Sequence, residues 1–515
     1  MSIKKNEVNL KKIISHCKEY GFVYGSSEIY DGLNAAYDYG PNGVLLKNNI
    51  KEFWWKSMVQ MNENIVGLDA SIFMHPSTWK ASGHVDAFND PLIDNKDSKK
   101  RYRADVLVEN HMAKIEHKIN KEVTKARKRF GKDFNEAQFV STHPRVINYR
   151  NQIQSIGSRM KTVIAENDLE SFKNLIVDLE ISDPVSGTQN WTEVRQFNLM
   201  FSTEMGSVSE GANTIYLRPE TAQGIFVNFS NIQKSSRMKP PFGIAQIGKA
   251  FRNEIIARQF IFRMREFEQM EMQFFVKPGE EMQWYDHWKS QRMRWHNALE
   301  LGPNKYRFHD HINLAHYANA ACDIEFEFPM GFKELEGIHS RTDFDLTAHE
   351  ELSGKKLRYF DPKENESYAP YVVETSIGLD RMFLAILSAA YQEEILEDHS
   401  ERVVLKLPAA LAPSKVAVLP LMNKDGLPEK AKEIFKELKY DFMAQYDAKD
   451  AIGRRYRRQD AVGTPYCITI DHKSLEDGTA TIRERDSMKQ ERMSTTEIKR
   501  LLEENVSLKK LLKSI

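Results

Sequence analysis

Residues 262–276 show the clearest alternation of apolar and polar positions in the chain. The apolar positions are Phe262, Met264, Met270, Met272, Phe274 and Val276. Successive side chains of a strand point to opposite faces, so this pattern predicts a strand with one buried face. The opposite face carries Arg263, Arg265, Phe267, Gln269, Glu271 and Gln273. This set of charges, amides and an aromatic ring is unusual for plain solvent exposure, although an amphipathic edge strand is the alternative. It suits a ligand with phosphates, a flat base and an ammonium group.

A second periodic segment spans residues 104–130. Its apolar residues recur at steps of three or four, as on one face of a helix: Met112, Ile115, Ile119, Val123, Ala126 and Phe130. The remainder of the helix is basic, with Lys118, Lys121, Lys125 and Arg127 to Arg129. A solvated basic face is the favoured interpretation, and contact with an RNA backbone is the alternative.

The domain organisation follows from the chain length and from proline positions. A chain of 515 residues predicts two or three domains. Pro408, Pro413 and Pro420 mark a boundary near residue 407, because proline interrupts regular elements. We expect a catalytic body over residues 1–407, with insertions at about 104–195 and 278–330. Strands alternate with helices in residues 413–515, which predicts a separate α/β domain.

Composition excludes several classes of protein. Lys plus Arg and Asp plus Glu each total 73, so the chain has no net charge to draw it to nucleic acid, although residues 413–515 are mildly basic. The cysteines, Cys17, Cys322 and Cys467, form no C-x-x-C pair, which excludes a disulfide framework and a cysteine-rich zinc site. The apolar runs are too short for a membrane span or a secretory leader. We therefore expect a cytoplasmic protein without a membrane partner.

One apparent nucleotide motif carries no function. Residues 243–250 fit the G-x-x-x-x-G-K pattern of phosphate-binding loops, but Ala250 stands where a Ser or Thr would hold magnesium. The segment also alternates like a strand and runs into another strand. We interpret it as a strand.

Five segments together resemble the glycyl-tRNA synthetases, a family of class II aminoacyl-tRNA synthetases. FRNE at 251–254 and FRMREFEQME at 262–271 resemble motif 2, and VVETSIGLDRMFLAIL at 372–387 resembles motif 3. LRPETAQGIFVNF at 217–229 is similar to a signature of the family, and residues 37–55 and 68–92 resemble its N-terminal region. The resemblance covers about four-fifths of the chain. It implies an α+β fold with an antiparallel sheet flanked by helices, a C-terminal anticodon-binding domain, and the homodimeric, eukaryotic-type form.

The resemblance also implies the ATP site. Arg252 would bridge the α-phosphate and the amino-acid carboxylate, Arg265 would approach the γ-phosphate, and these two with Arg381 are the catalytic candidates. Arg381 falls in the first turn of a predicted helix, where the helix dipole disfavours a cation, so we expect it to be held for a ligand, with a structural arginine as the alternative. Glu334 would hold Mg²⁺ between phosphates. The full set is Arg252, Asn253, Glu254, Phe262, Arg263, Met264, Arg265, Glu266, Phe267, Glu334, Leu335, Gly378, Leu379, Asp380 and Arg381.

Glycine offers only an ammonium group and a carboxylate for recognition. The resemblance implies a pocket in which Glu271, Glu374 and Ser376 surround the ammonium, with Glu220 nearby. Alanine would be rejected because its Cβ overpacks a rigid site, so no editing domain is expected. The full set is Arg103, Glu220, Phe267, Glu268, Gln269, Met270, Glu271, Glu374, Thr375, Ser376, Ile377 and Gly378.

The implied reaction joins glycine to ATP, releases pyrophosphate, and transfers glycine to the 3′ end of tRNA(Gly). A non-catalytic relative with the same fold is one alternative, but it should have lost the charged site residues. A synthetase for another amino acid is a second alternative, and it would lack the RPETAQGIF and FEQME motifs.

Two further expectations concern partners. RRYRR at 454–458 is either a solvated helix face or, as we favour, an RNA contact in which Tyr456 stacks on a base, and we expect Arg457 and Arg483 to contact tRNA too. In the predicted helix after Pro41, Trp54 and Trp55 both need to be covered, and we expect a homodimer interface to cover them.

Overall fold

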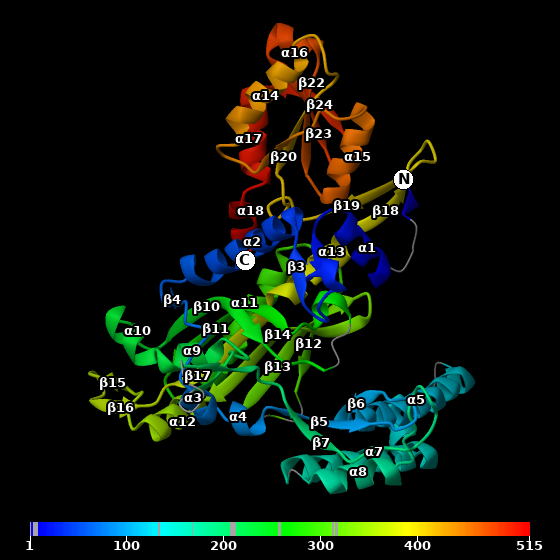
Figure 1. Cartoon of the computed structure of the whole chain (residues 1–515), viewed down its shortest axis with the longest axis vertical. Helices are drawn as coiled ribbons and strands as arrows, with labels where there is room; N and C mark the ends of the chain where they lie inside the picture. The colour runs from blue at the N-terminus through cyan, green and yellow to red at the C-terminus, as the bar shows by residue number, and fades with distance from the viewer. Residues whose placement is uncertain are drawn as a thin grey trace. The chain divides into compact units, whose positions relative to one another are not determined.

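The computed structural model describes residues 2–3, 9–131, 134–166, 168–206, 213–255, 259–311, 314 and 318–515. The chain divides into two compact units, of which one is Met1–Ser82 with Phe201–Ile515 and the other is Gly83–Met200. Figure 1 shows the elements of both units along the chain. The larger unit contains a catalytic body and a C-terminal domain.

A seven-stranded sheet forms the centre of the catalytic body. Its order is β12 (Tyr306–Asp310), β13 (Ala320–Phe328), β14 (Gly331–Thr342), β17 (Tyr371–Gly378), β11 (Glu266–Val276), β10 (Phe242–Phe251) and β4 (Ile65–Gly67). Neighbouring strands are antiparallel except for β10 and β4. The α+β class and the antiparallel sheet predicted from the sequence are confirmed, and the segment 243–250 is a strand.

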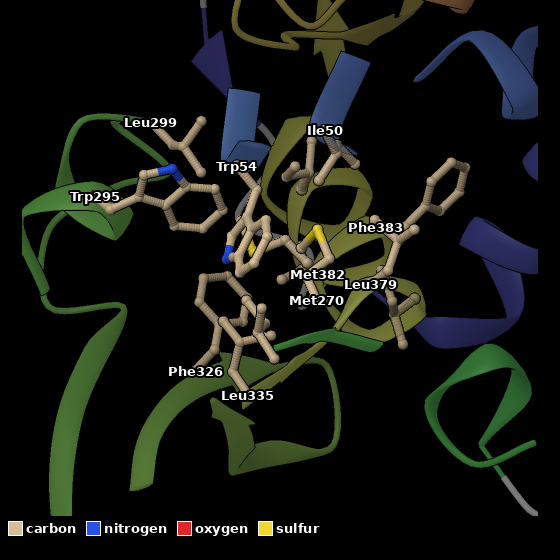
Figure 2. Packing of buried hydrophobic residues seen from close by; sticks show 14 of the residues in the cluster. Ile50, Trp54, Met270, Trp295, Leu299, Phe326, Leu335, Leu379, Met382 and Phe383 are labelled. Carbon is tan, nitrogen blue, oxygen red and sulfur yellow. The ribbon is translucent and has the colours of Figure 1, made fainter. Parts of the chain in front are cut away.

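One face of this sheet is covered by three helices. These are α2 (Pro41–Trp55), which continues as a π-helical turn over Lys56–Gln60, α11 (Glu281–Asn297) and α13 (Leu379–Ala390). Figure 2 shows Trp54 and Ile50 of α2 packed among Met382 of α13, Met270 of β11 and Phe326 of β13. At roughly 25 cal/mol per Å² of apolar surface, large side chains of this kind dominate the stability of the body.

The opposite face of the sheet is covered by shorter elements. They are α3 (Pro76–Ala81), α9 (Ala222–Val227), α10 (Phe229–Ser235) and α12 (Phe344–Ser353). Phe226 and Phe229 pack there on Phe275 of β11. The remaining elements are α1 (Leu10–Glu19), β2 (Val23–Gly25), β3 (Tyr37–Tyr39), β8 (Ser202–Met205), β9 (Asn213–Tyr216), β15 (Tyr359–Asp361), β16 (Glu366–Tyr368), and a sheet of β1 (Ser2–Ile3), β18 (Tyr391–Ile395) and β19 (Glu401–Leu405).

The C-terminal domain has its own sheet, in the order β21 (Ala444–Tyr446), β20 (Val416–Pro420), β22 (Tyr466–Ile470), β23 (Thr479–Glu484) and β24 (Gln490–Ser494). Its helices are α14 (Leu427–Leu438), α15 (Ile452–Val462), α16 (His472–Asp477), α17 (Thr495–Asn505) and α18 (Leu508–Leu512). The first three strands of the sheet are parallel and the last two antiparallel. A separate core of apolar residues lies within it, which confirms the predicted α/β domain.

Buried ion pairs join this domain to the catalytic body. Figure 1 shows α15 beside β19. Between them the fully buried guanidinium of Arg402 contacts Glu394 at 2.9 Å and Asp460 at 2.8 Å. Arg483 approaches the other oxygen of Asp460 at 2.8 Å. The name buried ion cluster is used below for Glu394, Arg402, Asp460 and Arg483.

The structure corrects the RNA contacts expected on this domain. Arg483 is buried in the ion cluster, so it is not available to tRNA. Tyr456 is also occupied, because its hydroxyl bonds to Thr469 and the Arg483 guanidinium lies 4.8 Å from its ring centroid. Arg455 is buried and donates to backbone carbonyls, and Arg458 pairs with two aspartates of the same domain. Most of the RRYRR segment therefore has an internal structural role.

The smaller unit consists of a three-stranded sheet and a helical layer. The sheet has the order β6 (Arg101–Arg103), β5 (Asn89–Asp94) and β7 (Arg195–Asn198). The short helix α4 (His84–Ala87) precedes β5, and β6 is connected to β7 through α5 (Ala104–Phe130), α6 (Glu136–Thr142), α7 (Pro144–Ala165) and α8 (Leu169–Asp178). The helix predicted over 104–130 is confirmed as α5, and Ile115, Val123 and Ala126 are buried. Phe130, assigned to the same face, is instead 53% exposed at the last turn of the helix.

Three other expectations differ from the structure. The strand predicted from Phe262 begins at Glu266, because Phe260–Phe262 forms a 3-10 turn before it. Residues 278–330 are not an insertion, since they supply α11 and two strands of the central sheet. Trp54 is fully buried within the single chain and so needs no partner subunit, whereas Trp55 is half-buried against Gly67 and its contact with a partner subunit stays a prediction.

Candidate active site

A cavity of about 220 Å³ lies at the ends of β11 and β17 nearest α13. Its lining includes many of the residues expected to bind ATP: Arg252, Glu254, Phe262, Arg263, Met264, Phe267, Glu334, Gly378, Asp380 and Arg381, together with Ile261, Gln269 and Ser376. These residues come from β11, β14, the β17–α13 junction and the segment joining β10 to β11. Residues nearly 130 positions apart in the sequence thus meet in one polar cavity.

Arg381 is placed by the junction of β17 and α13. Gly378 is the N-cap of α13, so Arg381 lies in the first turn as predicted. Its guanidinium contacts the Glu334 carboxylate at 3.1 Å and lies 4.5 Å from the Phe262 ring centroid. The positive charge of Arg381 lowers the pKa of Glu334. An arginine, an aromatic ring and an ionised carboxylate meet here, as phosphate and base recognition require.

Arg252 forms the other side of the cavity. Its guanidinium lies 5.3 Å from the Phe267 ring centroid, and its Nε donates to the Pro219 carbonyl at 3.0 Å. The Arg252 amide donates to the Arg265 carbonyl at 2.9 Å, which ties the two sides of the β10–β11 connection together. Arg252 and Arg381 are thus both held beside aromatic rings.

Arg265 has a different environment. Its Nε donates to the Glu254 carbonyl at 3.1 Å and its Nη1 to the Asn34 carbonyl at 3.0 Å. Its own amide donates to the Ala35 carbonyl at 2.9 Å. Arg265 therefore holds the β10–β11 connection against the loop before β3, and its contact with a γ-phosphate stays a prediction.

Polar side chains continue from the cavity along one face of the sheet. The strand register places Gln246, Glu271, Ser376 and Gly337 side by side across four strands, and Gln273, Glu374 and His339 in the next row. Glu271 and Glu374, both expected at the ammonium site, are almost fully buried here. The Thr221 hydroxyl and the Gln273 amide both donate to Glu271. The predicted pair of carboxylates is therefore brought together.

The two carboxylates differ in their protonation. Burial, and then the charges of Glu374 and Glu220, raise the pKa of Glu271 well above its usual range. Burial acts on Glu374 as well, but the Arg341 guanidinium at 2.7 Å and the His339 ring hold the pKa of Glu374 down at about 2. Without an ammonium group, Glu374 is ionised and Glu271 is protonated. Two neighbouring carboxylates whose pKa values differ in this way can bind one cation and release one proton.

Several residues expected at the site point away from it. Met270, Thr375 and Ile377 are buried on the opposite face with the core, because alternate strand residues face apart. Leu379 opens α13 and is buried in the same core. Glu268 lies on that face and pairs with Lys47 at 2.9 Å. Asp380 accepts from Lys47 at 2.9 Å and from the Glu268 amide at 2.8 Å, although part of it lines the cavity. Asp380 and Glu268 therefore hold α2, α13 and β11 together. Glu266 is exposed and pairs with Lys249.

A bulge explains the positions of Glu334 and Leu335. The register between β13 and β14 shifts at Ile324 and Glu325, which face Glu336 and Glu334 respectively. Leu335 is the extra residue, and its side chain lies in the apolar core. A bulge reverses the alternation of a strand, so Glu334 faces Arg381 while Gly337 and His339 face the carboxylates.

Sequence analysis did not assign several residues of this face. They are Thr221, Gln223, Gln246, His339, Arg341 and Asp345. Arg341 bridges Glu374 and Asp345, with contacts of 2.7 and 2.8 Å. Extending the alternation along β14 from Gly337 would have pointed to His339 and Arg341, whereas Asp345 lies on α12 and gives no periodic signal.

Arg103 and Asn253 were both expected to contact substrate. Arg103 lies in the smaller unit, where it pairs with Asp90 at 2.9 Å and Asp105 at 2.6 Å, and its approach to glycine stays a prediction. Asn253 lies in the connection between β10 and β11, and its contact with ATP also stays a prediction.

The residues present fit a magnesium ion bound with ATP. Glu334 is ionised and its side chain is 54% exposed, which suits an ion with one protein carboxylate and further ligands from phosphates and water. Over the described part of the chain, no group of three or more His, Cys, Asp and Glu side chains could hold a metal by itself.

Comparison with known proteins places this fold and site in one class. Residues 201–390 match the tRNA synthetase class II core domain (G, H, P, S and T), and residues 415–505 match an anticodon binding domain. The protein is therefore a class II aminoacyl-tRNA synthetase, an aminoacyl-tRNA ligase. In the helices that the structure describes, none is both long and apolar enough to cross a membrane.

Longer matches identify the family within this class. Residues 90–199 match the glycyl-tRNA synthetase insertion domain 1. The glycine–tRNA ligase of Chlorobaculum tepidum is 51% identical over 486 residues, which are 94% of this chain and 97% of that protein. Those of Treponema denticola and Staphylococcus haemolyticus are each 48% identical over 503 residues, covering 96% and 97% of this chain and 97% and 99% of theirs. The chain belongs to the glycine–tRNA ligase family.

The protonation of Glu271 predicts how the affinity of the site for an ammonium ligand depends on pH. The raised pKa means that Glu271 holds a proton in the empty site, and a bound ammonium favours the ionised form. Binding therefore releases a proton and strengthens as pH rises. We expect the KM for glycine to fall by up to about tenfold per pH unit below the pKa of Glu271. ATP–pyrophosphate exchange at saturating ATP, followed over about pH 6 to 8.5, measures this trend.

Glu271→Gln is the control for this prediction. The amide cannot ionise, so the variant should have a higher KM for glycine that changes little with pH. Parallel pH profiles in the variant and the unchanged protein would show that another group titrates.

Proposed function

We propose that this protein activates glycine with ATP to give glycyl-adenylate and pyrophosphate, and then transfers glycine to the 3′ end of tRNA(Gly). One observation carries the proposal: a cavity flanked by Arg252 and Arg381 continues into a face where Glu271 and Glu374 are buried together. The arginines suit the phosphates of ATP, and the carboxylates suit an ammonium group. The names of the relatives support glycine as the amino acid.

The chain's own residues contribute positioning and charge. In-line displacement at the α-phosphate requires the glycine carboxylate and ATP to be aligned, and little covalent chemistry is left to the protein. Arg252 neutralises the α-phosphate, Phe267 stacks with adenine, and Arg381 stabilises the departing pyrophosphate. Glu334 would hold Mg²⁺, which would supply further charge neutralisation on the phosphates.

Pyrophosphate exchange tests this function directly. Incubated with each of the twenty amino acids in turn, the protein should exchange labelled pyrophosphate into ATP with glycine alone. Exchange with a different amino acid would identify another synthetase. Exchange with none, by a folded protein, would favour the non-catalytic relative.

Other partners belong to the same proposal. The match of residues 415–505 to an anticodon binding domain supports tRNA binding there, through residues other than Tyr456 and Arg483. The homodimer rests mainly on the family resemblance, since Trp54 is fully covered within one chain and Trp55 is half-buried there. A cytoplasmic location is consistent with cysteines that are all unpaired and buried.

A further inference from the structure

A continuous chain of hydrogen bonds runs from α12 to the buried carboxylate Glu374. His349 Nε2 contacts Gln223 Oε1 at 2.8 Å, and Gln223 Nε2 donates to Asp345 Oδ1 at 3.0 Å. Asp345 accepts two bonds from Arg341, at 2.8 and 3.0 Å, and Arg341 Nη1 donates to Glu374 Oε2 at 2.7 Å. The chain thus links α9, α12, β14 and β17.

All five side chains are buried. Gln223 has no exposed surface, Asp345 is 2% exposed and Arg341 is 6% exposed. A buried arginine is costly unless its donors are satisfied, and the two bonds to one carboxylate fix the plane of the guanidinium. Once that plane is fixed, Nη1 holds the Glu374 carboxylate in one orientation.

Gln223 also reaches the third carboxylate near the site. Its Nε2 donates to Glu220 Oε1 at 3.0 Å as well as to Asp345. Both donors of the amide therefore face carboxylates, and the contact with His349 lies at the amide oxygen. This arrangement ties the orientation of Glu220 to that of Arg341.

We propose that Asp345 and Gln223 are positioning residues for glycine activation, which hold Glu374 and Glu220 in the orientation that receives the substrate ammonium. The inference rests on the proposed function, because it takes glycine as the ligand of this face. Asp345 fixes Arg341, Arg341 fixes Glu374, and Gln223 joins Glu220 to the same framework. Neither residue lines the cavity assigned to ATP.

Asp345→Asn separates positioning from folding. The amide keeps the shape of the side chain but removes the negative charge beside Arg341. Arg341 then has Glu374 as its main anionic partner and draws that carboxylate away from the ammonium. A misplacement of about 1 Å can cost on the order of 10²-fold in activity. We expect the KM for glycine to rise by about 10- to 100-fold, with the KM for ATP changed less than about twofold.

A matched control lies on the other face of the same strand. Glu336 of β14 is also fully buried, and it pairs with Arg292 at 2.5 Å and His296 at 2.7 Å. Glu336→Gln removes a comparable buried charge without touching the chain to Glu374. It should lower stability while the ratio of the two KM values stays near that of the unchanged protein.

A second variant covers the case in which Asp345→Asn does not fold. Gln223→Met keeps the volume and removes both donors, so it should raise the KM for glycine in the same direction by a smaller factor. Exchange kinetics and a thermal melt are measured for each variant and for the unchanged protein.

The outcomes separate the two proposals. If the unchanged protein shows no exchange with glycine, the proposed function fails. If it does, but the folded variants of Asp345 and Gln223 leave the KM for glycine unchanged, the positioning role is wrong. It is also wrong if these variants raise the KM values of glycine and ATP together, as a purely structural defect would.

Discussion

We expect Arg381→Ala to lower the kcat of glycine-dependent ATP–pyrophosphate exchange by about 10³-fold while the fold is retained. The guanidinium lies 3.1 Å from Glu334 and 4.5 Å from the Phe262 ring centroid, at the edge of the cavity assigned to ATP. Removing one such positioned donor typically costs 10²- to 10³-fold in kcat, and here the lost group also carries a full charge.

The stability of this variant should change little. Glu334 is 54% exposed, so it is not left as an unpaired buried charge, and a pair of this kind contributes roughly 0 to 1 kcal/mol. Steady-state exchange kinetics and a thermal melt provide the two measurements. Arg500→Ala, which breaks an exposed pair with Glu504 in the C-terminal domain, serves as the control with unchanged exchange. Loss of activity in proportion to loss of stability would indicate that Arg381 is a structural residue.

We expect Asp460→Ala to destabilise the protein by about 3–5 kcal/mol, because it leaves two buried guanidinium groups with too few anionic partners. Asp460 contacts Arg402 at 2.8 Å and Arg483 at 2.8 Å, and Glu394 alone then remains to balance them. Since Arg402 lies on β19 and Arg483 on β23, the effect falls on the contact between the catalytic body and the C-terminal domain. Denaturant unfolding followed by circular dichroism gives the free energy of unfolding.

Asp441→Ala is the matched control for Asp460→Ala. Asp441 pairs with Lys499 on the surface of the same domain at 2.7 Å, and both side chains are about two-fifths exposed. Its removal should cost less than about 1 kcal/mol. If the free energy of unfolding falls by the same small amount in both variants, the buried ion cluster does not hold the domain in place.

The site residues on β11 and β17 were predictable because a regular strand exposes alternate side chains. Glu271, Glu374 and Ser376 follow that rule, and the structure places them on one face. The same rule could have excluded Met270, Thr375 and Ile377, which a motif resemblance included because it treats neighbouring residues alike. Glu334 required the resemblance, since the bulge at Leu335 reverses the alternation of β14 and leaves no sign in the sequence.

The errors on the C-terminal domain have another cause. Arginines were expected at a tRNA surface, and the pattern of charges does not reveal whether an arginine has a buried carboxylate partner. Asp460 precedes Arg483 by 23 residues and comes from a different element. Similarly, Trp54 is covered by side chains from α11 and α13, which are distant in sequence. Periodicity identifies a buried face but not the segment that covers it.

The pairing of β5 with β7 has a consequence for the folding of the catalytic body. Asn89 at the start of the smaller unit pairs with Asn198 near its end, so the chain leaves and re-enters this unit through adjacent strands. Residues before 83 and after 200 are far apart in sequence, and joining them in an unfolded chain would carry the loop-closure entropy of the whole insertion. Once the smaller unit has folded, that long loop is replaced by two neighbouring ends. Residues before 83 and after 200 are then separated by a much shorter effective length of chain. The entropic barrier to forming the central sheet falls accordingly.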